Sequence, residues 1–203
     1  MRRVGIFSGT FDPVHEGHLA FARQALTANQ LDKIFFLVEP RPRRKQGVRA
    51  FEHRQKMVEL AIKDEPALGS IVLEQARFTA QETLPILQAR FKGAELFMLM
   101  GDDMLHHLGD WPHVDELLRG VGFIIGLRQD SPEAVTGRLQ ALEQARGLKL
   151  RYHIFQADHY DHSSSKIRQA YKNQRLPVGV PSKVAAYIKR QGLYEASRDQ
   201  QNG

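Results

Sequence analysis

Short apolar runs alternate with longer amphipathic segments along most of this chain, and this alternation limits the fold more than any other feature. The runs are rich in large or β-branched apolar residues and nearly free of charge, which is typical of buried strands. They are Val4–Phe7, Ile34–Val38, Ile71–Leu73, Leu96–Met100, Gly122–Leu127 and a weaker Arg151–Phe155. Strands that alternate with helices predict βαβ units and a parallel sheet with right-handed crossovers.

Apolar residues at helical spacing lie between these runs. They predict helices on the faces of Leu19, Ala22, Leu26 and of Met57, Leu60, Ala61, a helix over Thr79–Phe91, a short one at Leu117–Leu118 and one over Ala134–Ala145. Pro85 lies inside the third helix and indicates a late start or a kink. Ser163 can cap a further helix, Pro181 and Ser182 open the last one, and Gly192 ends it.

The predicted fold is therefore α/β, a doubly wound Rossmann-like parallel sheet with a C-terminal helical segment. We expect a single domain over residues 1–195, with the helices of residues 163–194 packed on it, and a disordered polar tail over residues 196–203. In such sheets ligands bind beyond the carboxyl ends of the strands. The residues after Phe7, Val38, Met100 and Leu127 are the candidates for a site.

Composition excludes several classes of protein. The chain has 203 residues and no cysteine, which excludes a disulfide framework, a thiolate metal site and a cysteine nucleophile. The first apolar run is too short for a signal peptide, and no stretch has the length of a membrane span. We expect a cytoplasmic protein without a membrane partner; a homo-oligomer is compatible with the sequence.

The formal charge of +6 has two interpretations, a nucleic-acid surface or a pocket for a phosphate-bearing small molecule. The basic residues are scattered, apart from Arg41, Arg43, Arg44 and Lys45. No aromatic residues interleave with that run as they would on a platform that stacks single-stranded bases. The pattern favours the pocket, and we expect no nucleic-acid partner.

The first motif joins the first strand to the first helix and reads G-T-F-D-P-V-H-E-G-H from Gly9 to His18. Gly9 lets the backbone approach a ligand, and His15 and His18 project from one face of the helix entry. The free N–H groups of that entry favour an anion, and two imidazoles there can donate hydrogen bonds to a transferring phosphoryl group. A bare H-x-x-H can equally be two surface histidines, and a zinc site lacks an evident third ligand.

The second motif is H-S-S-S-K-I-R, from His162 to Arg168. Its hydroxyls can cap a helix and bind phosphate oxygens, and the planar guanidinium of Arg168 can hold a phosphate. Taken alone, three serines are more often only a cap. The pairing with the first motif favours the binding role.

The two motifs together resemble the signatures of the adenylyltransferase and cytidylyltransferase superfamily, H-x-G-H and I-S-S-T-x-I-R. Here Ser165 stands for the threonine and His162 for the isoleucine. The resemblance implies that His15 and His18 stabilise the α-phosphate during transfer, with Arg168 as a third catalytic residue. It also implies that the second motif binds the ATP triphosphate.

Further segments are similar to the bacterial nicotinate mononucleotide adenylyltransferase family nearly end to end. They are R-x-x-M-x-x-L-A from Arg54, G-x-D-x-L from Gly101, Trp111 with Leu117–Leu118, Arg128 and residues 181–194. The resemblance implies an ATP site formed by Gly9, Thr10, Phe11, His18, Gly101, Asp103, Ser163, Ser164, Ser165 and Arg168. It implies an acceptor site formed by Thr10, Phe11, Lys45, Arg54, Thr79, Trp111 and Arg128.

Three segments depart from the family pattern. Pro40–Lys45 replaces a Pro-Pro-His-Lys loop, and Arg77–Leu84 replaces S-Y-T-x-x-T-L. Pro112 follows Trp111, where the family uses a backbone N–H to bind the nicotinate carboxylate, and proline has no such donor. The start of the third helix could supply donors instead.

The resemblance implies transfer of an adenylyl group from ATP to nicotinate mononucleotide, with release of pyrophosphate. Mg²⁺ is expected to arrive with ATP, held by phosphates and water rather than by a protein metal site. Nicotinamide mononucleotide or phosphopantetheine is an alternative acceptor. The alternative of another class is a catalytically silent nucleotide- or RNA-binding protein on the same fold.

Overall fold

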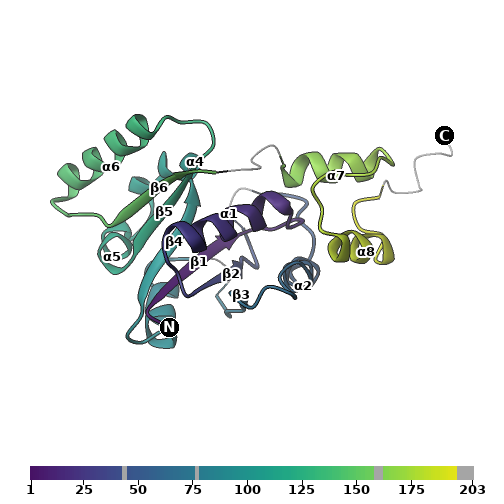
Figure 1. Cartoon of the computed structure of the whole chain (residues 1–203), viewed down its shortest axis with the longest axis horizontal. Helices are drawn as coiled ribbons and strands as arrows, with labels where there is room; N and C mark the ends of the chain where they lie inside the picture. Colours follow the sequence, from purple (N-terminus) through teal and green to yellow (C-terminus); the bar gives the residue numbers. More distant parts are fainter. Residues whose placement is uncertain (43–44, 76–77, 158–161, 196–203) are drawn as a thin grey trace.

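The computed structural model describes residues 1–42, 45–75, 78–157 and 162–195. Its centre is a six-stranded sheet of order β3-β2-β1-β4-β5-β6, in which every neighbouring pair is parallel (Figure 1). The strands are β1 (Arg3–Gly9), β2 (Lys33–Val38), β3 (Leu68–Ile71), β4 (Glu95–Gly101), β5 (Gly122–Leu127) and β6 (Tyr152–Gln156). The predicted α/β fold with a doubly wound parallel sheet is confirmed.

Helices cover both faces of this sheet because successive strand residues point to opposite sides. In β4, Leu96, Met98 and Met100 lie in one buried cluster, and Phe97 and Leu99 lie in the other. The first cluster packs against α3 (Thr83–Arg90), α4 (Asp102–Leu105), the 3₁₀ helix η1 (Leu108–Asp110), α5 (Val114–Gly120) and α6 (Pro132–Arg146). The second packs against α1 (Glu16–Ala28), α2 (Phe51–Ala61) and α8 (Ser182–Arg190).

The strand order reverses at β1, whose two neighbours are β2 and β4. Ligands of open parallel sheets bind at such a switch point, outside the carboxyl ends of the strands. The loop after β1 is the one that carries the first histidine motif. The topology therefore places the strongest sequence motif at the position where this architecture binds ligands.

Two predicted elements have different bounds in the structure. The third strand is Leu68–Ile71, not Ile71–Leu73, because it pairs only with β2 and that ladder ends at Ile71, beyond which Val72 is exposed. The third helix begins at Thr83 instead of Thr79. Pro85 is then its third residue, where the missing N–H has no intrahelical partner to lose, so the late start replaces the kink.

The two C-terminal helices lie at one end of the molecule, where α8 packs beside α2 (Figure 1). The helix α7 (Ser164–Lys172) begins after Ser163, whose hydroxyl accepts the N–H of Lys166, and α8 follows Pro181. Gly192 has a positive φ of 57° after the last turn, as expected of a stop signal. The predicted tail over residues 196–203 lies outside the described residues, as do Arg43, Arg44 and Arg77 of the predicted loops.

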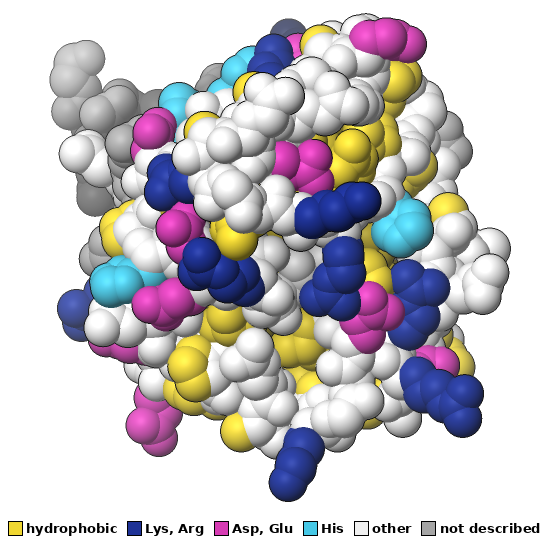
Figure 2. Space-filling model, turned by 90° about the vertical axis from the view of Figure 1, so that its left-hand side faces the viewer, with side chains coloured by type: hydrophobic (Ala, Val, Ile, Leu, Met, Phe, Trp, Pro, Cys, Tyr) yellow, Lys and Arg dark blue, Asp and Glu magenta, His cyan; other side chains and the backbone are white. Residues whose placement is uncertain are grey.

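Charges of both signs are mixed on the surface. On the face drawn in Figure 2, Lys and Arg side chains lie among Asp and Glu side chains and form no continuous basic area. Within the described ranges, none of the helices is both long and apolar enough to cross a membrane.

A matched pair of glycines tests how closely α1 packs on the sheet. A Cβ at Gly126 of β5 would lie 2.8 Å from Cδ2 of Phe21, whereas a Cβ at Gly137 of α6 would meet nothing within 4 Å. We expect Gly126→Ala to lower the free energy of unfolding by about 1–3 kcal/mol through overpacking. Gly137→Ala should raise it by about 0.5–1 kcal/mol, since alanine favours the helix. Urea unfolding of both variants measures these changes. An unchanged free energy of unfolding in Gly126→Ala would contradict the close packing of Phe21 on Gly126.

Candidate active site

A cleft of about 840 Å³ opens at the carboxyl ends of the strands. Each of the first five strands contributes the residues that follow it, and α7 closes one side. The predicted site residues that line it are Gly9, Thr10, Phe11, His18, Lys45, Thr79, Gly101, Asp103, Trp111, Arg128, Ser164, Ser165 and Arg168. Residues from distant parts of the sequence therefore meet in one cavity.

The two motif histidines stack at the entry of α1. His15 is the N-cap residue, and its ring lies 3.6 Å from that of His18, centroid to centroid. The backbone N–H of His15 donates to Nδ1 of His18 at 3.2 Å. Because Nδ1 accepts this hydrogen bond, the proton of a neutral His18 lies on Nε2. His18 therefore offers the cleft one N–H donor.

Both histidines are held in the neutral form. Burial, followed by the electrostatic effects of the nearby His162 and Arg128, lowers the pKa of His15 from 6.5 to about 3. Burial, with His15, Arg128 and Lys45, lowers the pKa of His18 well below its usual value. His15 is only 5% exposed and does not line the cleft, and its Nδ1 has no hydrogen-bond partner among the described residues. A buried nitrogen without a hydrogen-bond partner costs free energy.

The start of α7 is joined directly to the first motif. Arg168 donates from Nη1 to the carbonyl oxygen of Asp12 at 2.7 Å, and the hydroxyl of Ser164 donates to that of Pro13 at 2.9 Å. The second nitrogen of Arg168, Nη2, donates to Oγ of Ser165 at 3.2 Å. The two motifs are thus one structural unit, with Ser165 and Arg168 facing the cleft. Ser163 does not line the cleft, because its hydroxyl caps α7.

The wall opposite the histidines follows β4 and β5. A Cβ at Gly101 would lie 3.4 Å from Nε of Arg128 and would also meet the carboxylate of Asp103. Glycine therefore lets these two side chains lie across the end of β4, where they border the cleft. Trp111 borders the cleft with one side and packs on the first core cluster with the other. Phe11 reaches the cleft with little of its surface, since it is only 2% exposed.

Arg54 does not fit the predicted contact with the acceptor. It is 1% exposed, and the cleft residues do not include it. Its guanidinium donates to the carbonyl oxygens of Arg49, Thr10, Glu39 and Pro40 at 2.8–2.9 Å. These carbonyls follow β1 and β2, so Arg54 joins the loops of two strands. In this chain Arg54 therefore has a structural task, which a sequence does not distinguish from ligand binding.

Two residues without a predicted role also shape the site. The buried carboxylate of Asp12 accepts the hydroxyl of Tyr194 at 2.5 Å and the N–H of Arg49 at 3.3 Å. Burial, and then this bond to Asp12, raises the pKa of Tyr194 above its usual value. Asp12 belongs to the first motif and Tyr194 to the last segment of the resemblance, but no sequence signal indicates that they meet. Two further histidines, His107 and His113, also line the cleft. Their closeness to Trp111 in the sequence is the one signal that could have indicated this.

The charged side chains that line the cleft are of both signs. Among the described residues, no three His, Asp or Glu side chains are grouped so that they could hold a metal ion. Lys45, Arg128 and Arg168 all border the cleft. These three cations can hold an anion such as the phosphates of a nucleotide. The carboxylates of Glu39, Glu82, Asp103 and Asp110 belong to the same lining.

A neutral histidine donor, a serine- and arginine-bearing helix start and a cleft at the switch point define a nucleotidyltransferase-type site on a Rossmann-like sheet. The sequence pattern of the cytidylyltransferase-like family matches residues 6–170. Over 97% of this chain and 100% of its own length, the nicotinate-nucleotide adenylyltransferase of Bacillus subtilis is 32% identical. The chain belongs to the cytidylyltransferase-like family and, within it, to the nicotinate-nucleotide adenylyltransferases, as the resemblance predicted.

Other relatives agree. A probable nicotinate-nucleotide adenylyltransferase of Neisseria meningitidis is 34% identical over 96% of this chain and 100% of its own length. The Plasmodium falciparum nicotinic acid mononucleotide adenylyltransferase complexed with NaAD has a TM-score of 0.78 at 16% identity, over 96% of this chain and 98% of that one. At that identity the likeness concerns the fold.

The buried histidines make the stability of the free protein depend on pH. Because the pKa of His15 falls from 6.5 to about 3 on folding, the unfolded chain binds more protons between these values. The stabilisation is complete above pH 6.5 and is lost as the pH falls. Asparagine does not titrate in this range. Between pH 7.5 and pH 5, we expect the free energy of unfolding of His15→Asn to fall by about 2 kcal/mol less than that of the wild type. Urea unfolding at both pH values measures this; equal losses would contradict a buried neutral His15.

Proposed function

We propose that the chain transfers the adenylyl group of ATP to nicotinate mononucleotide, giving nicotinate adenine dinucleotide and pyrophosphate in NAD biosynthesis. The observation that carries the proposal is the neutral His18, whose Nδ1 is occupied by the N–H of His15 and whose Nε2–H is left for the cleft. A donor of this kind can stabilise the charge that develops on a transferring phosphoryl group. Membership in the nicotinate-nucleotide adenylyltransferases supports the choice of substrates.

The reaction needs positioning rather than a protein nucleophile. The 5′-phosphate of the acceptor attacks the α-phosphorus of ATP in line, and pyrophosphate leaves. His18 donates to the α-phosphate, with His15 behind it. Ser165 and Arg168 at the start of α7 bind the triphosphate, and Asp103 accepts hydrogen bonds from the ATP ribose. Lys45, Thr79, Trp111 and Arg128 border the part of the cleft proposed for the acceptor.

Mg²⁺ belongs to the proposed reaction as a companion of ATP. It would arrive with ATP, keep several waters and offset part of the negative charge of the phosphates. The cationic side chains of the cleft would then neutralise the remaining negative charge of the phosphates. A cytoplasmic location and a homo-oligomer stay predictions.

Substitution of the motif histidines tests the proposed catalytic role. We expect His18→Ala to lower the rate of pyrophosphate release about 10²–10⁴-fold, the usual effect of losing a transition-state donor. His15→Ala should also lower the rate, because the ring of His15 stacks on that of His18. The control is His153→Ala, which removes an exposed histidine of β6 outside the cleft and should keep the wild-type rate. A near-normal rate in a folded His18→Ala enzyme would refute the role.

A side-by-side assay of two acceptors tests the substrate. Pro112 has no N–H for a carboxylate, but Thr79 to Glu82, just before α3, line the same cleft. We expect nicotinate mononucleotide to be preferred over nicotinamide mononucleotide at least about tenfold in kcat/KM, since cationic and N–H donors favour an acid. Pyrophosphate release measures both. Equal use would indicate a dual enzyme, and no release with either would point to another acceptor such as phosphopantetheine.

A silent nucleotide- or RNA-binding protein remains the alternative of another class. Two observations speak against it: the ordered histidine pair, and the mixture of charges on the face shown in Figure 2. RNA binding that weakens steeply with salt, without any turnover of ATP, would support it.

A further inference from the structure

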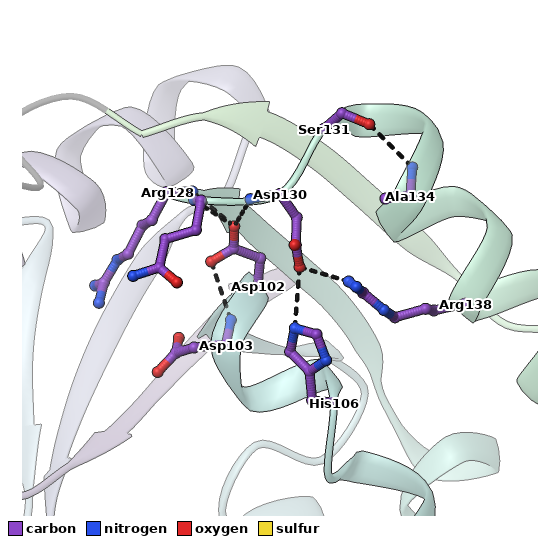
Figure 3. Close-up of polar contacts among 9 residues, drawn as sticks. Asp102, Asp103, His106, Arg128, Asp130, Ser131, Ala134 and Arg138 are labelled. Atoms are coloured by element: carbon purple, nitrogen blue, oxygen red, sulfur yellow. Dashed lines mark hydrogen bonds and ion pairs between the residues drawn. The ribbon is translucent and has the colours of Figure 1, made fainter.

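The buried carboxylate of Asp102 is a charged group that the proposed reaction does not use. Asp102 is 1% exposed and does not line the cleft. Its Oδ2 accepts the backbone N–H groups of Arg128, Gln129 and Asp130 at 2.9, 2.8 and 2.9 Å, and its Oδ1 accepts that of Asp103 at 3.0 Å (Figure 3). One side chain at the end of β4 therefore binds the whole first turn of the chain after β5.

The hydrogen bonds to Asp102 are charge-assisted. Three consecutive N–H groups that converge on one oxygen form an anion-binding nest. Burial raises the pKa of Asp102, but the four backbone donors lower it by more, so the pKa lies below its usual value. Hydrogen bonds to an ionised acceptor are stronger than those between neutral groups. The carboxylate thus fixes the loop from Arg128 to Asp130 more firmly than a neutral side chain could.

A second contact joins the same two segments. Oδ2 of Asp130 lies 3.1 Å from Nε2 of His106, just after α4, and accepts Nη1 of Arg138 in α6 at 2.5 Å (Figure 3). Because β4 and β5 are neighbours in the sheet, the chain after each strand leaves at the same edge. The loop with Arg128 and the segment from Asp102 to His106 are therefore held as one wall of the cleft.

Arg128 is the part of this wall that reaches the cleft. Figure 3 shows its side chain extending away from Asp102, on the side where Asp103 lies. Its positive charge contributes to the lowered pKa of both His15 and His18. The guanidinium therefore acts on the same space as the histidines, and its placement depends on the backbone that Asp102 fixes.

We propose that Asp102 is a positioning residue that holds Arg128 in the cleft and thereby sets the affinity for the phosphate- and carboxylate-bearing acceptor. The identity of that acceptor rests on the proposed function. The family pattern G-x-D-x-L leaves position 102 unspecified, so the resemblance gives Asp102 no role. Asp102 does not border the cleft, so it can act on a ligand only through a neighbour that does, Arg128 or Asp103. The proposal assigns the effect on the acceptor to Arg128.

Asp102→Asn keeps the size of the side chain and removes its charge. We expect KM for nicotinate mononucleotide, and its dissociation constant measured by calorimetry, to rise about tenfold or more while kcat changes less than about threefold. The matched control is Asp115→Asn, which breaks a surface ion pair with Arg146 and should change neither constant. An unchanged KM and dissociation constant in Asp102→Asn would overturn the proposal.

A double-mutant cycle with Arg128→Met separates positioning from a merely structural role. If Asp102 acts through Arg128, adding Asp102→Asn to Arg128→Met should change the dissociation constant by less than about twofold. A structural role would weaken binding equally in both backgrounds, and such multiplying effects would overturn the proposal. So would an Arg128→Met protein with unchanged affinity for nicotinate mononucleotide and ATP, since Asp102 would then have nothing to position.

Calorimetry keeps the outcome separate from the proposed function. A wild-type protein that binds but releases no pyrophosphate would contradict the reaction, while the cycle of dissociation constants would still decide the role of Asp102. If Asp102→Asn does not fold, Asp102→Ala is titrated with formate, which can occupy the three N–H groups. If Asp102→Ala binds nicotinate mononucleotide more tightly in formate than in chloride at equal ionic strength, the proposal is supported. Equal affinity in the two salts contradicts it.

Discussion

The loop between β1 and α1 depends on hydrogen bonds from side chains that lie far away in the sequence. Its carbonyl oxygens at Thr10, Asp12 and Pro13 accept from Arg54, Arg168 and Ser164, respectively. The carboxylate of Asp12 accepts the hydroxyl of Tyr194. The loop lies outside the helices and strands, so without these side chains its carbonyl oxygens would lack those hydrogen bonds. The catalytic geometry proposed for His15 and His18 follows from this anchoring, because the loop leads directly into them.

Electrostatics gives the site its second constraint. Burial and the nearby cations keep the histidines neutral, so they can donate without adding charge in the free protein. The positive charge of the cleft resides instead on lysine and arginine, which suits a ligand with several phosphates. The carboxylate of Asp102 accepts hydrogen bonds from backbone N–H groups and does not pair with the cations of the cleft.

The local signals were enough for the sheet and for the two motifs. The strands β1, β2, β4 and β5 are apolar on both faces, so their runs stand out from the sequence. The edge strand β3 was misplaced because Val72, although apolar, lies beyond the end of its only ladder. The start of α3 was open because proline permits either a kink or a first-turn position. Pairing with β2 and packing on the core decided both.

The sequence by itself determined the fold class, the family and the two motifs, since each depends on residue order and spacing along short segments. Only the tertiary structure decided which side chains work together. It placed Arg54 under the loops instead of in the cleft, brought Tyr194 onto Asp12, and gave Asp102 the amides after β5. These contacts join residues separated by 15, 182 and 27 positions. Their partners are backbone groups or a buried carboxylate, which carry no sequence signature of the contact they make.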